Sequence, residues 1–317
     1  MTAATPLATL SPALHRVIEQ VGTVVLGKRE AVTFALVGLV AEGHVLLEDV
    51  PGTGKTSLAR ALAWSVGGSF RRIQFTSDLL PSDVTGLSLY SNELERFCFS
   101  PGPVFANVVL ADELNRTSPR TQSALLECMS DGVVSVDGNS ERLPRPFFVI
   151  ATQNPMDFEG TYPLPEAQLD RFLLRLELGY PPLADERRIL AERRENDPVE
   201  RPEPGLSPEQ LSAAIAAARA VRVEDSVLDY ILALITATRS HRALSLGASP
   251  RCSLGLRRAV QALALLEGRD YAVPDDVKRL FLPVVAHRVL PAAVRDSGLG
   301  TVADALQEIL DTCAVPR

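Results

Sequence analysis

Eight residues near the start of the chain combine glycines, a lysine and a threonine in a spacing that suits phosphate binding. Residues 49–56 read DVPGTGKT and follow a short apolar run at residues 45–47. Glycines let backbone N–H groups turn toward a phosphate, and a helix that begins there adds the positive end of its dipole. Lys55 would neutralise the charge of the β- and γ-phosphates, and the hydroxyl of Thr56 would be a ligand of Mg²⁺. The segment therefore predicts a nucleoside triphosphate site.

One position departs from the strict phosphate-loop pattern GxxxxGK[ST], because Asp49 stands where that pattern has glycine. The alternative is a glycine-rich turn that binds no ligand and simply precedes a helix. The apolar run before the loop and the helical pattern at residues 55–66 favour the phosphate loop. The residues expected to contact the nucleotide are Pro51, Gly52, Thr53, Gly54, Lys55, Thr56 and Ser57.

Two adjacent carboxylates form a second candidate group. The apolar residues 108–111 predict a buried strand that ends at Asp112 and Glu113. Ligands of open α/β sheets bind at such strand ends. Asp112 would hold Mg²⁺ through its water shell, and Glu113 would orient and deprotonate the attacking water. The alternative is an acidic cap of the next helix, which has less support beside a phosphate loop.

Three further polar residues could complete the same site. Asn154 ends the apolar stretch at residues 147–154, where its amide could contact the γ-phosphate or position water; alternatively, it is a turn-forming asparagine before proline. Arg171 precedes another apolar stretch, and Arg251 lies at a predicted helix start. Either arginine could instead form a surface ion pair.

The elements that must position these residues form an alternating pattern. Apolar strand candidates occur at residues 45–47, 71–75, 108–111, 147–152 and 172–178, with helices or inserted hairpins between them. Nearly continuous apolar runs indicate parallel strands buried on both faces, and hence an α/β fold. Residues 82–99 and 132–143 read as inserted hairpins, the second turning at Asp137 and Gly138. Helical periodicity covers residues 10–40.

A second region follows a proline-rich, charged stretch at residues 195–208, which predicts an exposed connector. Beyond it, apolar spacings of three and four predict a small helical bundle. The predicted helices lie at residues 211–220, 227–238, 254–267, 274–282 and 302–310.

Composition excludes several other classes of protein. The 317 residues carry 32 basic and 39 acidic side chains, a net charge of −7, which argues against a protein that holds nucleic acid through its phosphates. No apolar run approaches the roughly 18 residues of a membrane span, and no secretory signal is visible.

The sequence has no NKxD-type guanine contact and no LSGGQ-like signature, which argues against a GTPase and an ABC-type ATPase. Four separated cysteines favour reduced thiols, and hence a cytoplasmic protein: Cys98, Cys128, Cys252 and Cys313.

Together these segments resemble one family across nearly the whole chain, the AAA+ ATPases of the MoxR type, in the helix-2-insert group. The similarity rests on residues 46–56, 74–86, 109–127, 151–155, 159–172 and 247–251. It implies an AAA+ P-loop core with a parallel five-stranded sheet, followed by a small all-α lid. The expected boundaries are residues 1–183 for the core with its N-terminal helices, 184–208 for the connector and 209–317 for the lid.

The resemblance also implies roles for individual residues. Lys55 and Thr56 match Walker A, Asp112 and Glu113 match Walker B, and Asn154 matches sensor 1. Arg251 matches sensor 2 of the lid, and Arg171 resembles the arginine finger that enters a neighbouring subunit's site. The implied cofactors are ATP and Mg²⁺, with adenine near residues 25–27 and the lid.

The implied function is ATP hydrolysis in an oligomeric ring, usually of six subunits, that remodels, assembles or activates a client protein. A von Willebrand factor A domain protein is the expected partner. One alternative is a DNA-acting motor or loader, against which the acidic composition argues. Another is an ATP-dependent interaction switch with little turnover, against which Glu113 and Arg171 argue.

Overall fold

A single parallel sheet forms the centre of the first half of the chain. The computed structural model describes residues 7–93, 95–154, 160–192, 204–292 and 301–316. Its five-stranded sheet has the order β2-β5-β8-β1-β9, and every neighbouring pair in it is parallel. The strands are β1 (Val45–Glu48), β2 (Phe70–Gln74), β5 (Val108–Asp112), β8 (Phe148–Gln153) and β9 (Leu174–Leu176). The predicted α/β fold with a parallel five-stranded sheet is therefore confirmed.

The two faces of this sheet contribute to different hydrophobic cores, since successive strand residues point to opposite sides. Val108 and Leu110 of β5 pack in one cluster, whereas Val109 and Ala111 pack in the other. The first cluster contains α1 (Leu7–Val24), α2 (Arg29–Val40) and α3 (Lys55–Ser65). The second contains α5 (Pro119–Asp131) and part of α4 (Pro81–Thr85). A sheet buried on both faces explains the nearly continuous apolar runs in the sequence.

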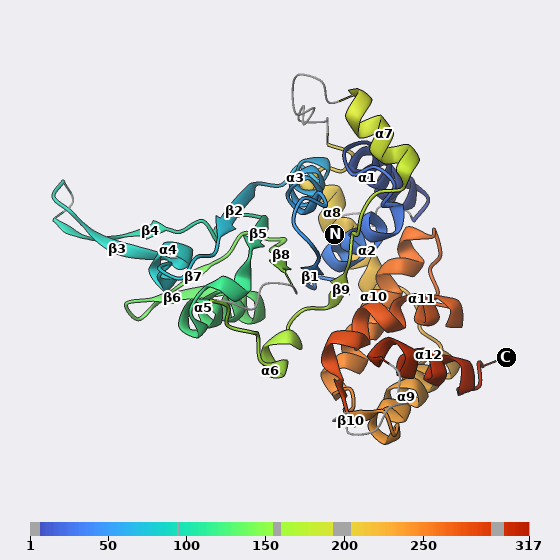
Figure 1. The fold of residues 1–317 in the computed structure, drawn as a ribbon. Helices are drawn as coiled ribbons and strands as arrows, with labels where there is room; N and C mark the ends of the chain where they lie inside the picture. The colour runs from blue at the N-terminus through green and yellow to red at the C-terminus, as the bar shows by residue number, and fades with distance from the viewer. Residues whose placement is uncertain (1–6, 94, 155–159, 193–203, 293–300, 317) are drawn as a thin grey trace.

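Two hairpins interrupt the alternation of strand and helix, as the sequence predicts. The first is β3 (Gly86–Ser91) with β4 (Arg96–Pro101), and the second is β6 (Val133–Val136) with β7 (Asn139–Arg142). The second turns at Asp137 and Gly138, both with positive φ. The β3–β4 hairpin extends away from the sheet, at the opposite end of the molecule from α11 and α12 (Figure 1).

The second half of the chain is helical and packs against the first hydrophobic cluster. Its helices are α8 (Pro208–Ala220), α9 (Asp225–Ser240), α10 (Pro250–Leu266), α11 (Pro274–Val285) and α12 (Val302–Thr312). Helix α10 contacts α1, α2 and α8 (Figure 1). β10 (Leu244–Leu246) and β11 (Leu290–Pro291) form a short antiparallel pair in this half of the chain. The sequence analysis did not predict this pair.

Three local features differ from the sequence prediction. The helical stretch at residues 10–40 is two helices, α1 and α2, separated by a loop at residues 25–28. The last strand is shorter than predicted: β9 ends at Leu176, because the backbone N–H of Leu178 bonds to a side chain instead of a neighbouring strand. Two helices, α6 (Glu166–Leu169) and α7 (Leu183–Glu192), flank β9, and α7 occupies the start of the expected connector. Residues 193–203 of that connector lie outside the described residues.

No helix in the described ranges is long and apolar enough to cross a membrane.

Candidate functional site

The glycine-rich loop connects β1 to α3 at the carboxyl edge of the sheet. Gly52 and Gly54 have φ angles of +85° and +94°, a region where other residues are strained. Helix α3 begins at Lys55, so its N-terminus faces the loop. A cavity of about 390 Å³ lies against this loop. Its lining residues are Pro51, Gly52, Gly54, Lys55, Thr56, Ser57, Arg72, Asp112, Glu113, Thr152 and Asn154.

The side chain of Lys55 lies within its own loop. Its Nζ donates to the backbone carbonyls of Asp49 (2.7 Å) and Val50 (3.1 Å). Burial lowers the pKa of Lys55 from its usual value, and the charges of Asp49, Asp112 and Glu113 oppose this shift. A cation is therefore held at the wall of the cavity where phosphate charge would be neutralised.

The carboxylate of Asp112 is bonded on both oxygens. Thr152 Oγ1 donates to Asp112 Oδ1 at 2.6 Å, while Nε and Nη2 of Arg72 donate to Oδ2 at 3.0 and 2.6 Å. Arg72 thus places positive charge at the carboxylate expected to hold the metal. Asp112 and Thr56 line the same cavity, and both offer the hard oxygen ligands that Mg²⁺ prefers.

The donors around the cavity therefore fit Mg²⁺, with part of its shell supplied by the nucleotide. In the described part of the chain, no group of three or more His, Cys, Asp or Glu side chains could hold a metal by itself. Mg²⁺ usually keeps several waters and binds through one or two protein groups together with substrate phosphates. Thr56 and Asp112 match that mode.

Glu113 has an uncommon backbone conformation that directs it into the cavity. Its φ is +57°, a left-handed value found mostly at special sites. The backbone N–H of Glu113 donates to Thr152 Oγ1 at 2.9 Å, and Gln74 Nε2 donates to Glu113 Oε2 at 2.7 Å. Arg116 Nε lies 3.4 Å from the same oxygen. The carboxylate is thus held by its neighbours.

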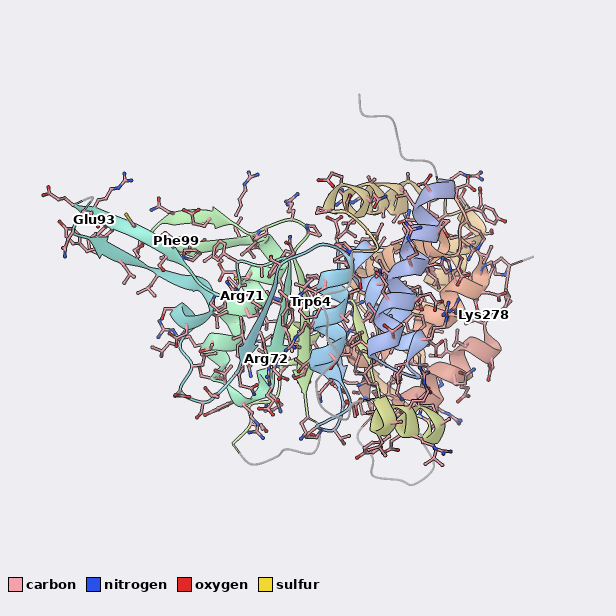
Figure 2. The ribbon with its side chains drawn as sticks, turned by 90° about the horizontal axis from the view of Figure 1, so that it is seen from above. Trp64, Arg71, Arg72, Glu93, Phe99 and Lys278 are labelled. Atoms are coloured by element: carbon pink, nitrogen blue, oxygen red, sulfur yellow. The ribbon has the colours of Figure 1, made fainter. Side chains whose placement is uncertain are left out.

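Three residues around these carboxylates were missed by sequence analysis. Arg72 and Gln74 lie on β2, whose register places Gln74 beside Asp112, and Thr152 lies on β8. The signal that could have found Arg72 and Gln74 is the alternation of side chains along β2. Ile73 is buried on one face of the strand, and Arg72 and Gln74 point to the other face. Figure 2 shows Arg71 and Arg72 on this strand, at the middle of the molecule.

Asn154, expected as sensor 1, does line the cavity and is 9% exposed. The two arginines do not line it. Arg171 follows α6, and Arg251 lies in the first turn of α10. These two segments contact each other, because Ser249 Oγ donates to Asp170 Oδ2 at 3.4 Å. The structure therefore brings Walker A, Walker B and Asn154 together, and places both arginines elsewhere on the same chain.

A second cavity, of about 120 Å³, lies on the other side of the glycine-rich loop. Val25 and Leu26, from the segment expected near adenine, form one wall with Val24 and Lys28. Pro181, which precedes α7, and Ile189, which belongs to α7, form another wall. The sequence resemblance implied that the lid would lie near adenine. Gly52, Thr53, Gly54 and Ser57 complete the lining, so the two cavities share part of the loop.

Comparison with known proteins gives consistent matches over nearly the whole chain. Residues 44–174 match the ATPase family associated with various cellular activities (AAA), and residues 236–309 match the AAA lid domain. Chaperone MoxR1 of Mycobacterium tuberculosis is 39% identical over 96% of this chain and 82% of its own length. The uncharacterised protein YeaC of Bacillus subtilis is 49% identical over 97% and 96% of the two chains. A crystal structure of a candidate ATPase from Cytophaga hutchinsonii has a TM-score of 0.89 at 34% identity, covering 98% of this chain and 97% of that one.

Proposed function

Because this chain belongs to the AAA+ ATPases of the MoxR type, we propose that it hydrolyses Mg²⁺-bound ATP in a ring and remodels a client protein. The observation that carries the proposal is the meeting of four groups in one cavity: Lys55, Thr56, Asp112 and Glu113. Cation, hydroxyl and two carboxylates are the set that phosphoryl transfer to water requires. The four cysteines are free, which supports a reducing compartment such as the cytoplasm.

The proposed chemistry assigns each group a step. Lys55 leaves the carbonyls of its loop and bonds to the phosphates. Thr56 and Asp112 would hold Mg²⁺, which would neutralise phosphate charge. Asn154 orients the γ-phosphate or the water. Glu113 accepts a proton from that water as its oxygen bonds to the γ-phosphorus. The bond from the γ-phosphorus to the bridging oxygen breaks, which gives ADP and phosphate.

The positions of the two arginines support the proposal of a ring. Neither Arg171 nor Arg251 lines the cavity of its own chain, and Arg72, which does line it, is paired with Asp112. A further cation is needed for the charge of the transition state. We propose that a neighbouring subunit supplies Arg171 and Arg251, so that hydrolysis depends on assembly. Six subunits is the number that the family resemblance implies.

The client-binding part of the proposal concerns the β3–β4 hairpin. Apolar side chains are exposed along it: Leu87, Leu89, Tyr90 and Phe97. Tyr90 and Phe97 pack edge to face on one side of the hairpin, with ring centroids 5.5 Å apart. Leu87 and Leu89 alternate with Tyr90 and so lie on the other face, which leaves apolar side chains exposed on both faces of the hairpin. Exposed apolar side chains of this kind suit contact with a protein. The relative MoxR1 is named a chaperone, which is a protein that acts on other proteins. A von Willebrand factor A domain protein is the proposed partner of this chain.

The enzyme proposal is tested by ATP turnover of the purified protein under assembling conditions. Lys55→Ala should abolish turnover, whereas Lys278→Ala, an exposed lysine on α11, should leave it unchanged. Figure 2 shows Lys278 at the far end of the molecule from the hairpin residue Glu93. Equal turnover in wild type and Lys55→Ala would refute the proposal.

The ring proposal has a sharper test in mixed assemblies. Lys55→Ala subunits retain Arg171 but lack a working site, and Arg171→Ala subunits have the reverse defect. If the arginine acts on the neighbouring subunit, mixing the two inactive proteins should restore turnover. A mixture that stays inactive would show that Arg171 acts within its own chain or not at all.

The client is sought with Glu113→Gln, which should hold ATP without hydrolysing it. Recovery of a von Willebrand factor A domain protein or an immature enzyme, lost when Lys55 is also replaced, would support remodelling. Recovery of nucleic acid, with DNA-stimulated turnover that falls steeply with salt, would support the motor instead. Turnover that stays very slow in assembled protein, with partner docking unaffected by Arg171→Ala, would support the switch.

A further inference from the structure

Asp49, the residue that breaks the strict phosphate-loop pattern, carries a carboxylate bonded to three backbone N–H groups. Its Oδ1 accepts from Val50 at 2.8 Å. Its Oδ2 accepts from Leu178 at 2.8 Å and from Gly179 at 2.6 Å. Asp49 is 8% exposed, so these bonds are shielded from water. A carboxylate that accepts several backbone N–H bonds is a strong local anchor.

The anchor joins two strands just beyond the point where their pairing ends. β1 and β9 are paired only as far as Leu47 and Leu176, after which β1 leads into the phosphate loop. The segment after β9 would there leave its N–H groups without a strand partner. The carboxylate of Asp49 satisfies two of them and so fixes the segment that leads through Pro181 into α7.

The same segment is also held by the loop between α1 and α2. Lys28 Nζ donates to the backbone carbonyl of Tyr180 at 2.7 Å. At Gly27, with φ of +71°, an added Cβ would lie 2.5 Å from Asp185 Oδ2 and 2.7 Å from Pro182 Cδ, so the two loops touch closely. The second cavity lies between these loops and the phosphate loop.

We propose that Asp49 is a positioning residue for the nucleotide base. It holds residues 178–182 and α7 as one wall of the second cavity, and Lys28 holds the same wall through the carbonyl of Tyr180. This inference rests on the proposed function, because it takes the first cavity as the phosphate site. The base would lie between Val25 and Leu26 on one side and Pro181 and Ile189 on the other.

The charge of Asp49 separates its effect on the base from its effect on the phosphates. Asparagine is nearly the same size but offers one acceptor oxygen, and its amide N–H₂ would face N–H donors. In Asp49→Asn at least one of the three N–H groups therefore loses its acceptor, and the bonds that remain lose the strengthening effect of the charge. The phosphates do not lose attraction, since a negative charge near Lys55 has been removed. Weaker binding of nucleotide without weaker binding of phosphate is the signature of this role.

The test compares ADP with inorganic pyrophosphate by calorimetric titration of the full chain in the presence of Mg²⁺. For Asp49→Asn we expect the Kd for ADP to rise about tenfold, the effect of one lost charged hydrogen bond. The Kd for pyrophosphate should stay the same or fall. Lys28→Met should raise the Kd for ADP in the same direction, and the matched control Asp229→Asn, on the exposed side of α9, should change neither.

Three other outcomes would overturn the inference. Equal weakening of ADP and pyrophosphate in Asp49→Asn would assign Asp49 to the phosphate loop alone, and unchanged ADP affinity would show that the wall does not need it. If Asp49→Asn does not fold, an unchanged Kd for ADP in Lys28→Met would exclude the proposed role of this wall in binding the base. If any of these three results is obtained while the wild-type protein binds ADP, only this inference is refuted. If the wild-type protein binds no nucleotide, the proposed function is refuted as well.

Discussion

Arg288 and Asp170 form an ion pair between the helical part of the chain and the turn after α6, with Arg288 Nε 3.1 Å from Asp170 Oδ1. The arginine side chain is 4% exposed and also donates, through Nη2, to the backbone carbonyl of Phe172 at 2.7 Å. Asp170 immediately precedes Arg171, the proposed arginine finger. The pair therefore couples the position of that finger to the helical part.

Arg288→Met should weaken this coupling and destabilise the fold. The change leaves the carboxylate of Asp170 without this cation and removes a donor from the backbone carbonyls of Asp170 and Phe172. Breaking a buried pair in this way costs about 3 kcal/mol. Denaturant unfolding measures the loss. Asp170→Asn keeps an acceptor and should cost less, so an equal loss in both variants would contradict the explanation.

Arg72→Met should strengthen metal binding at Asp112. In the structure Arg72 donates twice to Asp112 Oδ2, so it competes with a metal cation for that oxygen. Removing this cation should tighten nucleotide-free Mn²⁺ binding about tenfold, which electron paramagnetic resonance can measure. Arg71→Met is the matched control, because the neighbouring strand residue points to the opposite face. Unchanged Mn²⁺ affinity in Arg72→Met would show that the guanidinium does not compete.

Thr152→Val should lower both stability and turnover. The hydroxyl of this 1% exposed residue donates to Asp112 and accepts from the backbone N–H of Glu113. Valine has the same shape but leaves both groups without this partner, at a cost of about 2 kcal/mol. Thr152→Ser keeps the hydroxyl and should restore kcat; serine and valine variants with the same kcat would argue against this role. Thermal unfolding and steady-state ATP turnover provide the two measurements.

The pH dependence of stability should be dominated by buried histidines at moderately acid pH. His44 is buried; its Nε2 lies 3.0 Å from the carbonyl of Met129, and its Nδ1 accepts from the N–H of Val149 at 3.0 Å. This arrangement uses the neutral ring, and burial lowers the pKa of His44 from 6.5 to about 4. Burial also lowers the pKa of His287 well below its usual value.

The sign of the effect follows from the pH at which the folded and the unfolded chain each protonate His44. The unfolded chain protonates His44 below its ordinary pKa, whereas the folded chain does so only near the lowered value. Stability should therefore fall as pH drops from about 6.5 to about 4, by up to about 1.4 kcal/mol per pH unit for one histidine. Denaturant unfolding of wild type and His44→Gln across this range measures the slope. A variant with the wild-type slope would exclude His44 as a cause.

The sequence predicts those parts of the site that depend on local pattern. The glycines of the phosphate loop, the strand before Asp112 and the strand before Asn154 are each recognisable from a few consecutive residues, and their strand ends meet at one sheet edge. The roles of Arg72 and Thr152 depend on which strands are neighbours, which is a property of the whole sheet. The order β2-β5-β8 brings their side chains to Asp112 from both sides.

Long-range contacts also explain why the function of Asp49 was not visible. The sequence marks this residue only as a departure from a pattern. Its partners, Leu178 and Gly179, lie 129 and 130 positions further along the chain. Arg171 and Arg251 show a related limit of sequence analysis. Residue type predicts that they belong to a nucleotide site, but it does not indicate that the cavity of their own chain lacks them.

The first hydrophobic cluster has a consequence for how the chain folds. It joins side chains of α1, α2 and α3 to those of α8, α10 and α11 without interruption. Residues that share one continuous core unfold together, since exposing one half removes burial from the other. The helical part and this face of the sheet should therefore melt as a single cooperative unit. Within the described residues, the two hairpins contribute no side chain to this cluster, so they should be able to open without disturbing it.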